Sequence, residues 1–402
     1  MYIKIETSRL DYFRNKQTEI HAELYQGIID SIEIGESRGS KVGRRIILPS
    51  SFIGGPRDMQ KRYMDAMALV QRFGKPDIFL TITCNPNWPE IKQELGNNDE
   101  IQNRPDLVVR IFKAKLEELK IDLFKKQIFG NSFDKIVSTE IPNEYAYPHL
   151  HSVVVKHMMH GRCGILNPNN ICMEKDGVCR SHYPKSYVLQ TSFGEDSYPK
   201  YKRCNNNKKV KVRGHYLDNQ WVVPYNPYLV AKFDCHINVE ICSTIKAVKY
   251  LYKYVYKGYD RISFCINAKD DIIDIDEIKR FQSTRWIYPP KEMWRIYGFI
   301  LYEIYPSVIS LQLHLEDNQL VTYRKYDNLT TVVRRDDTHR TMLTEFFQMN
   351  LRNEKAKTLL YKQFPQQFVW DKRYKLWAPR KKGQVVGRIV TANPIEGEMY
   401  YL

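Results

Sequence analysis

The sequence lacks several features that would place it in a familiar class of protein. No Gly-x-x-x-x-Gly-Lys-Ser/Thr segment occurs in its 402 residues, which excludes a P-loop motor within this chain. There is no N-terminal apolar region of the secretory type and no long uncharged apolar run, so we expect no membrane-spanning segment. Acidic residues are few, 46 against 62 basic ones, and the net charge of +16 predicts a polyanionic partner. No internal repeat is present.

Cysteines and aromatic residues are more informative. The eight cysteines are spread through a large chain without a secretion signal, which favours reduced thiols. The 28 tyrosines and 17 phenylalanines are interleaved with lysine and arginine, a mixture that suits stacking on unpaired bases. For most of these aromatic residues we expect a place in the core instead.

The order of the expected elements favours an α+β fold. Expected helices cover 20–31, 58–73, 105–129, 241–257, 291–305 and 341–364. Expected strands cover 78–83, 135–140, 148–156 and 233–239. Strand, helix, strand, turn and strand in succession predict a central antiparallel sheet flanked by helices.

Composition divides the chain into four parts. These are an N-terminal helical and basic segment (1–48), a core (49–159 and 229–284), a loop-rich Cys/His and basic insertion (160–228), and a C-terminal mixed α/β segment (285–402). The last residues read as the middle of a strand, which suggests truncation of a longer ancestor.

Two tyrosines share one face of the helix expected at 241–257. Tyr250 and Tyr254 are four residues apart and therefore stack on that face, and Lys253 and Lys257 fall on the same side. Apolar residues gather on another side, which predicts a buried stripe with two phenols and two ammonium groups facing outward. An aromatic helix face packed on a sheet is the alternative, and it suits Tyr252 best.

His149 and His151 are two residues apart in a run that ends in three valines. In a strand, both imidazoles would point to the same side. Two imidazoles on one side, near two phenols and a basic surface, suit nucleophilic attack on a phosphodiester. Taken alone, a His-x-His pair is more often an ordinary surface or core feature.

A second group of metal-ligand residues lies in the insertion. Its members are His160, Cys163, Cys172, Cys179 and His182. His and Cys at these short spacings match zinc ligands, although the middle spacings are irregular. Three cysteines and one of the two histidines would hold a structural Zn²⁺; free thiols in a loop are the alternative.

The insertion also carries a run of basic residues. Candidates for phosphate contact are Lys202, Arg203, Lys208, Lys209, Lys211 and Arg213, against a default of a solvated charge run. Trp88, at the end of an expected strand, is a candidate for stacking on a base, and a buried turn tryptophan is the alternative.

Four blocks together give the chain a family resemblance. They are residues 50–56, residues 79–91 with Thr-Cys-Asn-Pro-Asn-Trp-Pro-Glu, residues 148–151 with Pro-His-Leu-His, and residues 249–258 with Lys-Tyr-x-x-Lys-Tyr-x-x-Lys. In order and spacing they resemble the N-terminal Rep-like region of Helitron transposases, which are HUH endonucleases of the two-tyrosine kind. The resemblance runs from about residue 20 to the C-terminus.

The resemblance implies an HUH-type sheet in the core and a metal-dependent nuclease that nicks and transfers single-stranded DNA. Its nucleophiles fall on Tyr250 and Tyr254, and its metal-binding histidines on His149 and His151. Imidazole and carboxylate ligands suit Mg²⁺ or Mn²⁺. Glu140, at the end of the preceding expected strand, is the expected third ligand. Glu144 is the alternative, because residues 140–147 depart from the family pattern. Lys253 and Lys257 would neutralise the phosphate or the departing oxyanion.

The same resemblance implies a separate Pif1-type helicase as partner and a location in the nucleus. The rival function is a nucleic-acid-binding protein, decayed or domesticated from a transposon, that no longer cuts DNA. A metal-dependent phosphoesterase that uses water as nucleophile is a third interpretation.

Overall fold

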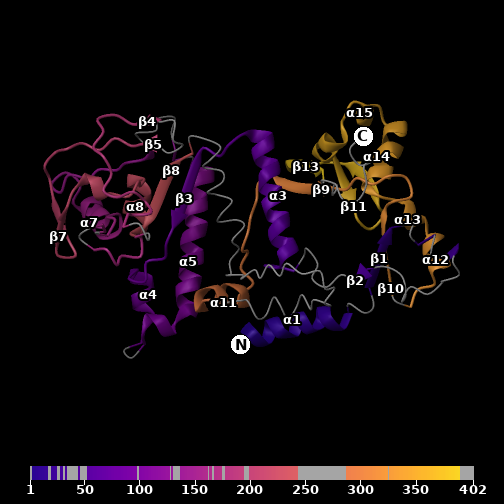
Figure 1. Ribbon diagram of the computed structural model, residues 1–402, viewed down its shortest axis with the longest axis horizontal. Coiled ribbons are helices and arrows are strands. Elements are labelled where there is room, and N and C mark those ends of the chain that lie inside the picture. Colours follow the sequence, from indigo (N-terminus) through magenta and orange to yellow (C-terminus); the bar gives the residue numbers. More distant parts are fainter. Residues whose placement is uncertain are drawn as a thin grey trace. The chain divides into compact units, whose positions relative to one another are not determined.

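A computed structural model of the chain describes residues 2–16, 20–24, 28–29, 32–33, 44–45, 52–96, 99–126, 128–129, 136–161, 163–164, 167–173, 177–193, 199–242, 287–324 and 326–389. The chain divides into two compact units, residues 75–252 and residues 1–74 with 253–402. Helices and short strands occur in both units (Figure 1), which confirms the expected α+β class.

The unit of residues 75–252 combines short sheets with helices. Its elements are β3 (Ile78–Ile82), α4 (Pro89–Gln93), η2 (Ile101–Asn103), α5 (Pro105–Lys120), the π-helical η3 (Ile121–Lys125), α7 (Pro148–His157), β4 (Ser192–Phe193), β5 (Pro199–Lys200), β6 (Val210–Val212), β7 (His215–Leu217), η4 (Asn219–Trp221), α8 (Pro227–Phe233) and β8 (Ile237–Ile241). Strands β3 and β8 pair antiparallel, from Ile78 opposite Ile241 to Ile82 opposite Ile237. Among the residues that are described, the sheets of this unit have two strands each, so the large central antiparallel sheet expected for the core is not evident there.

One core fills this unit. Its buried side chains include Trp88 and Leu107, Val154 of α7, Val239 of β8, and Val222, which follows η4. All five are nearly inaccessible to solvent. Tyr201 and Tyr225 belong to the same core, so the stretch expected as an insertion also supplies core side chains. Lys232 of α8 forms ion pairs with Asp122 and Glu118, which attaches α8 to the end of α5.

Helix α7 replaces the strand expected at 148–156, so that prediction is wrong. Pro148 lies in the first turn of the helix. Backbone N–H groups there have no acceptor within the helix, so the lack of an N–H in proline costs no hydrogen bond, and the fixed φ of proline suits a helix. Val153, Val154 and Met158 are at most 3% exposed, and their spacing follows a helical face. Burial of this face outweighs the β-preference of three consecutive valines.

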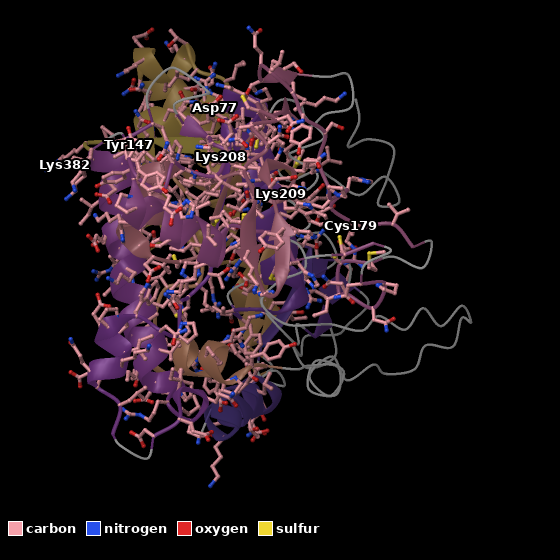
Figure 2. The ribbon with its side chains drawn as sticks, turned by 90° about the vertical axis from the view of Figure 1, so that its left-hand side faces the viewer. Asp77, Tyr147, Cys179, Lys208, Lys209 and Lys382 are labelled. Atoms are coloured by element: carbon pink, nitrogen blue, oxygen red, sulfur yellow. The ribbon has the colours of Figure 1, made fainter. Side chains whose placement is uncertain are left out.

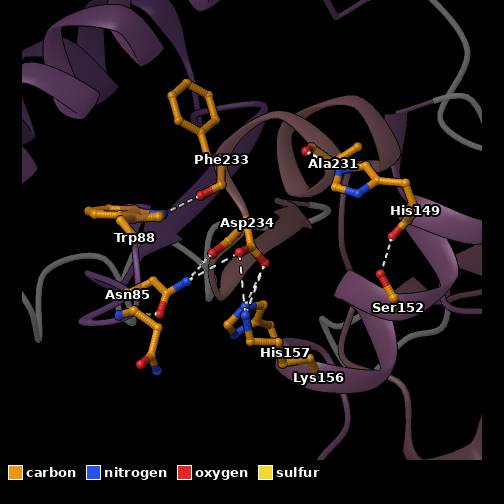
Figure 3. Close-up of polar contacts among 10 residues, drawn as sticks. Asn85, Trp88, His149, Ser152, Lys156, His157, Ala231, Phe233 and Asp234 are labelled. Atoms are coloured by element: carbon orange, nitrogen blue, oxygen red, sulfur yellow. Dashed lines mark hydrogen bonds and ion pairs between the residues drawn. The ribbon is translucent and has the colours of Figure 1, made fainter. Parts of the chain in front are cut away.

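The Thr-Cys-Asn-Pro-Asn-Trp block caps the C-terminal end of α8. The Asn85 amide donates to the Asp234 carbonyl at 2.6 Å, and the Trp88 indole N–H donates to the Phe233 carbonyl at 2.7 Å. Both bonds are drawn in Figure 3. They satisfy carbonyl groups that have no partner within the helix. Trp88 therefore stabilises the fold by capping the end of α8.

The other unit consists of residues 1–74 and 253–402. Its elements are α1 (Tyr2–Lys16), β1 (Ile20–Leu24), β2 (Arg44–Arg45), α3 (Pro56–Phe73), α11 (Pro289–Ile296), β9 (Ser307–Leu311), β10 (Leu320–Arg324), α12 (Leu329–Val333), α13 (Asp336–His339), α14 (Met342–Arg352), α15 (Glu354–Lys357), η5 (Tyr361–Gln363), α16 (Phe364–Gln367), β11 (Phe368–Asp371), β12 (Leu376–Pro379) and β13 (Val385–Ile389). The strands form a three-stranded sheet β10-β1-β2, a hairpin β11-β12 and a parallel pair β13-β9.

Several expected boundaries in this unit were wrong. The helix expected at 20–31 begins as strand β1, because Ile20–Leu24 pairs with β10 along its whole length. The helix expected at 341–364 is interrupted at Asn353, whose side chain caps the next short helix by accepting from the Ala356 N–H. The expected helix at 58–73 is confirmed as α3.

We predict that Asn85→Ala destabilises the protein by about 1–3 kcal/mol, because the variant removes the side-chain donor to the part-buried carbonyl of Asp234 at the end of α8. Urea unfolding followed by tryptophan fluorescence measures the change. Asn87→Ala is the matched control, since Asn87 is exposed and only its backbone N–H bonds to Asn85. Equal midpoints for the two variants would contradict the capping role.

Candidate functional site

Four side chains that follow α7 form a compact group of metal-ligand type. They are His160, Cys163, Cys172 and Cys179, and their ligand atoms all lie within 4.8 Å of one another. No other group of three or more His, Cys, Asp or Glu side chains in the described part of the chain has its ligand atoms gathered closely enough to hold a metal ion. Figure 2 labels Cys179 among the neighbouring loops.

Local structure holds the histidine in place. The His160 N–H donates to the Trp221 carbonyl at 2.8 Å, just after a bridge between Met159 and Val222. Its imidazole stacks on the Tyr183 ring, with centroids 4.1 Å apart and planes 13° apart. The ring is thus held on one face, with Nε2 toward the sulfur atoms.

The cysteines are held by backbone pairing within the loop. The Arg180 N–H donates to the Cys172 carbonyl at 2.7 Å, and Met173 forms a bridge with Cys179. Cys163 and Cys179 are each 3% exposed and form a small apolar cluster with Leu217 and Trp221. The site is therefore largely closed to water.

The distances fit tetrahedral zinc. The Nε2 atom of His160 lies 3.6 Å from Cys163 Sγ and 3.5 Å from Cys179 Sγ. Zn–S and Zn–N bonds of about 2.3 and 2.0–2.1 Å, at tetrahedral angles, place N and S about 3.6 Å apart. Three sulfurs, one imidazole and a closed environment are typical of a structural zinc site, so the expected Zn²⁺ ligands fit.

Burial shifts the protonation of the free ligands. It raises the pKa of Cys163 to about 12 and also raises the pKa of Cys172. Burial opposes ionisation of Cys179 as well, yet hydrogen bonds from the backbone at Tyr183 and Ser181 and from the other two thiols bring its pKa below the usual value. Burial lowers the pKa of His160, which favours the neutral imidazole that a metal requires.

His182 does not belong to this group. The two histidines were left as alternatives by the sequence, and the structure places His160 with the cysteines. The His182 side chain is exposed, and its backbone adopts a positive φ of 53° in the turn after Cys179.

The expected Mg²⁺ or Mn²⁺ ligands lie apart from one another. His149 and His151 occupy the first turn of α7, where two residues of separation turn the side chains by about 200°. His149 Nε2 lies 3.0 Å from the Ala231 carbonyl oxygen, near the C-terminal end of α8 (Figure 3), and His151 Nδ1 lies 3.0 Å from the Pro142 carbonyl oxygen. The Glu140 carboxylate accepts the Cys204 N–H at 2.8 Å. The described geometry does not gather these three side chains around one point.

Tyr250, Tyr254, Lys253 and Lys257 lie outside the described residues. Their roles stay predictions from the sequence.

Two of the expected nucleic-acid contacts need correction. Arg203 is 3% exposed, and its guanidinium donates to the carbonyls of Thr139 and Asn219 inside the unit. Trp88 is 2% exposed, with its indole N–H bonded to Phe233. Neither side chain is accessible to a nucleic acid. Lys202, Lys208, Lys209, Lys211 and Arg213 are exposed.

Sequence reasoning missed a polar cluster at the junction of α7 and α8. Asp234 has a left-handed backbone, with φ of 39°, at the end of α8. Its carboxylate accepts from His157 Nε2 at 3.0 Å and from Lys156 Nζ at 3.3 Å, as Figure 3 shows. The helical register of α7 is the signal that could have placed His157 here, but the strand expectation concealed it.

Comparison with known families supports part of the resemblance. Residues 1–154 match the family described as the Helitron helicase-like domain at the N-terminus. This confirms the resemblance for that part of the chain and indicates a protein derived from a transposon. A search of curated proteins gave no match. None of the described helices combines the length and apolarity needed to cross a bilayer.

We predict that the purified protein carries one Zn²⁺ per chain and that His160→Asn or Cys179→Ser removes it, since each variant breaks the ligand set. Elemental analysis after gel filtration measures the metal. His182→Asn is the matched control and should retain full zinc, because asparagine tolerates a positive φ. Loss of zinc in the control but not in His160→Asn would contradict the assignment.

We predict that the protein becomes less stable as the pH falls from about 6.5. Burial lowers the pKa of His157, against an opposing effect of Asp234, and burial lowers the pKa of His236. The unfolded chain therefore binds more protons than the folded protein in this range, which favours unfolding. Urea midpoints at pH 7.5 and 5.5 measure the effect. His236→Gln should reduce the difference relative to the parent; an unchanged difference would show that His236 plays no part.

Proposed function

We propose that the protein nicks and transfers single-stranded DNA through a tyrosine nucleophile, as in Helitron transposition. The match of residues 1–154 to the Helitron helicase-like domain carries this proposal, since the matched region includes the Pro-His-Leu-His block. The net charge of +16 supports a polyanionic substrate.

The proposed reaction is a phosphoryl transfer to tyrosine. The phenolic oxygen of Tyr250 or Tyr254 bonds to the phosphorus, and the bond from phosphorus to the 3′ oxygen breaks. The products are a 5′-phosphotyrosyl link and a free 3′-OH, after the phenol has lost its proton and the leaving oxygen has gained one. Attack by a 3′-OH on the phosphotyrosyl phosphorus reverses the chemistry, releases the tyrosine and joins a strand without ATP. Attack by the second tyrosine on that phosphorus would instead move the DNA strand from one phenolic oxygen to the other. Lys253 and Lys257 supply positive charge for the phosphate.

A phenol with a pKa near ~10 needs help to attack at neutral pH. Mg²⁺ or Mn²⁺ would supply charge neutralisation at the phosphate. His149, His151 and Glu140 remain the proposed ligands. One nitrogen of each imidazole lies against a backbone carbonyl, a contact that typically orients a metal-binding histidine. Binding of one cation by both rings requires the first turn of α7 to open.

A second candidate function is DNA binding without cutting, by a domesticated transposon derivative. The placement of His149 and His151 on different sides of α7 favours it. Under either function we propose a nuclear location, and for the nuclease we propose a separate Pif1-type helicase as partner.

We predict that the protein forms a covalent adduct with an end-labelled single-stranded oligonucleotide in the presence of Mn²⁺. Tyr250→Phe and Tyr254→Phe should each reduce the adduct, and the double variant should abolish it, because phenylalanine has no nucleophilic oxygen. Denaturing gels measure the adduct.

Tyr252→Phe is the matched control and should leave the adduct unchanged. Full adduct formation by the double variant would refute the tyrosine assignment. Binding without an adduct in the parent protein would favour the second candidate function.

A further inference from the structure

A two-stranded hairpin lies next to the metal-ligand cluster. Strands β6 and β7 pair antiparallel, with Lys211 opposite Tyr216 and Val210 opposite Leu217. Arg213 and Gly214 form the two-residue turn, both with positive φ (47° and 83°), as tight hairpin turns require. Directly opposed residues share a face, so Lys211 and Tyr216 lie on one face and Val210, Val212 and Leu217 on the other.

The apolar face packs on the metal-ligand cluster. Leu217 is 4% exposed and contacts the same apolar group as Cys163, Cys179 and Trp221, with Val212 packed against it. The hairpin therefore packs on the loop that carries the four candidate ligands. A two-stranded hairpin alone is at best marginally stable in water, so this support is needed for its shape.

The opposite face is basic and aromatic. Tyr216 is 70% exposed beside Lys211, and the exposed Lys208 and Lys209, labelled in Figure 2, lead into the hairpin. Among the described residues, no carboxylate forms an ion pair with Lys208, Lys209 or Lys211. Asp218, which follows β7, accepts the hydroxyl of Tyr187 and the N–H of Gln220. The face thus keeps its positive charge.

The turn lies against the metal-ligand loop. A guanidinium nitrogen of Arg213 is 3.7 Å from the position that a Cβ on Gly161 would occupy, and Gly161 lies between His160 and Cys163. Arg213 is nevertheless exposed. The turn of the hairpin is thus next to the loop segment between His160 and Cys163.

We propose that this hairpin binds single-stranded DNA, with Tyr216 stacking on a base and Lys211 contacting a phosphate, and that Zn²⁺ on the Cys₃His cluster maintains its shape. The choice of DNA as the ligand rests on the proposed function. An exposed ring beside an ammonium group suits an unpaired strand, whose bases are free to stack and whose phosphates lie close to them. In a duplex the bases are stacked on one another, so an exposed ring on a ribbon gains little there.

Fluorescence anisotropy of the zinc-loaded full chain with labelled oligo(dT) tests the proposal, without added Mg²⁺ or Mn²⁺. Tyr216→Ala should weaken binding about 5- to 150-fold, the range expected for loss of one stacked base. Tyr216→Phe should bind like the parent, because stacking needs only the ring. Lys211→Gln should lower the slope of log affinity against log salt by about 0.7, the value for one phosphate contact. Lys92→Gln, an equal charge change at an exposed position on α4, should leave that slope unchanged.

Unchanged affinity of Tyr216→Ala would overturn the stacking role, and equal, Tyr216-dependent binding of a duplex would overturn the preference for single strands. Cys163→Ser should lose zinc and bind as weakly as Tyr216→Ala; full affinity without zinc would overturn the supporting role of the metal. Failure of the proposed nuclease function can be distinguished from failure of the hairpin proposal. The Tyr250→Phe, Tyr254→Phe double variant tests adduct formation and leaves the residues of the hairpin unchanged.

Discussion

Burial of one face of α7 is the interaction on which the rest of its unit depends. Val153, Val154 and Met158 are enclosed in the core, and each such side chain contributes roughly 1.5–3 kcal/mol when fully buried. Their burial fixes the rotation of the helix about its axis. That rotation directs His157 to Asp234 at the end of α8, and the chain leaving the helix carries His160 to the cysteines. One apolar stripe therefore positions both the polar junction and the metal-ligand cluster.

The contrast between sequence and structure is clearest in this helix. Three consecutive valines favour a strand locally. Nothing in the neighbouring sequence indicates that Val153, Val154 and Met158 are buried in one core. Long periodic helices such as α3, and the strand at 78–82, were predictable because their patterns are unambiguous. Strand β1 was not, since its partner β10 lies some three hundred residues away in the chain.

The zinc-ligand group could be found from residue types and short spacings, but the choice between His160 and His182 could not. That choice depends on the stacking of His160 on Tyr183 and on its bond to Trp221, and both partners are well separated from His160 in the chain. The same limitation explains Arg203 and Trp88. Each lies in a stretch whose composition suits nucleic-acid contact. In the folded unit each side chain is buried instead, and its N–H groups donate to backbone carbonyls of residues far away in the chain.

The short distance along the chain between α7 and His160 has a further consequence. The helix ends at His157, so a metal ion held by His160 would be anchored only three residues beyond it. Cobalt in place of zinc has visible absorption bands whose position and intensity follow the coordination geometry. A cobalt-loaded protein would therefore give an optical reporter for movement of α7, readable while a ligand is added and without any label on the chain.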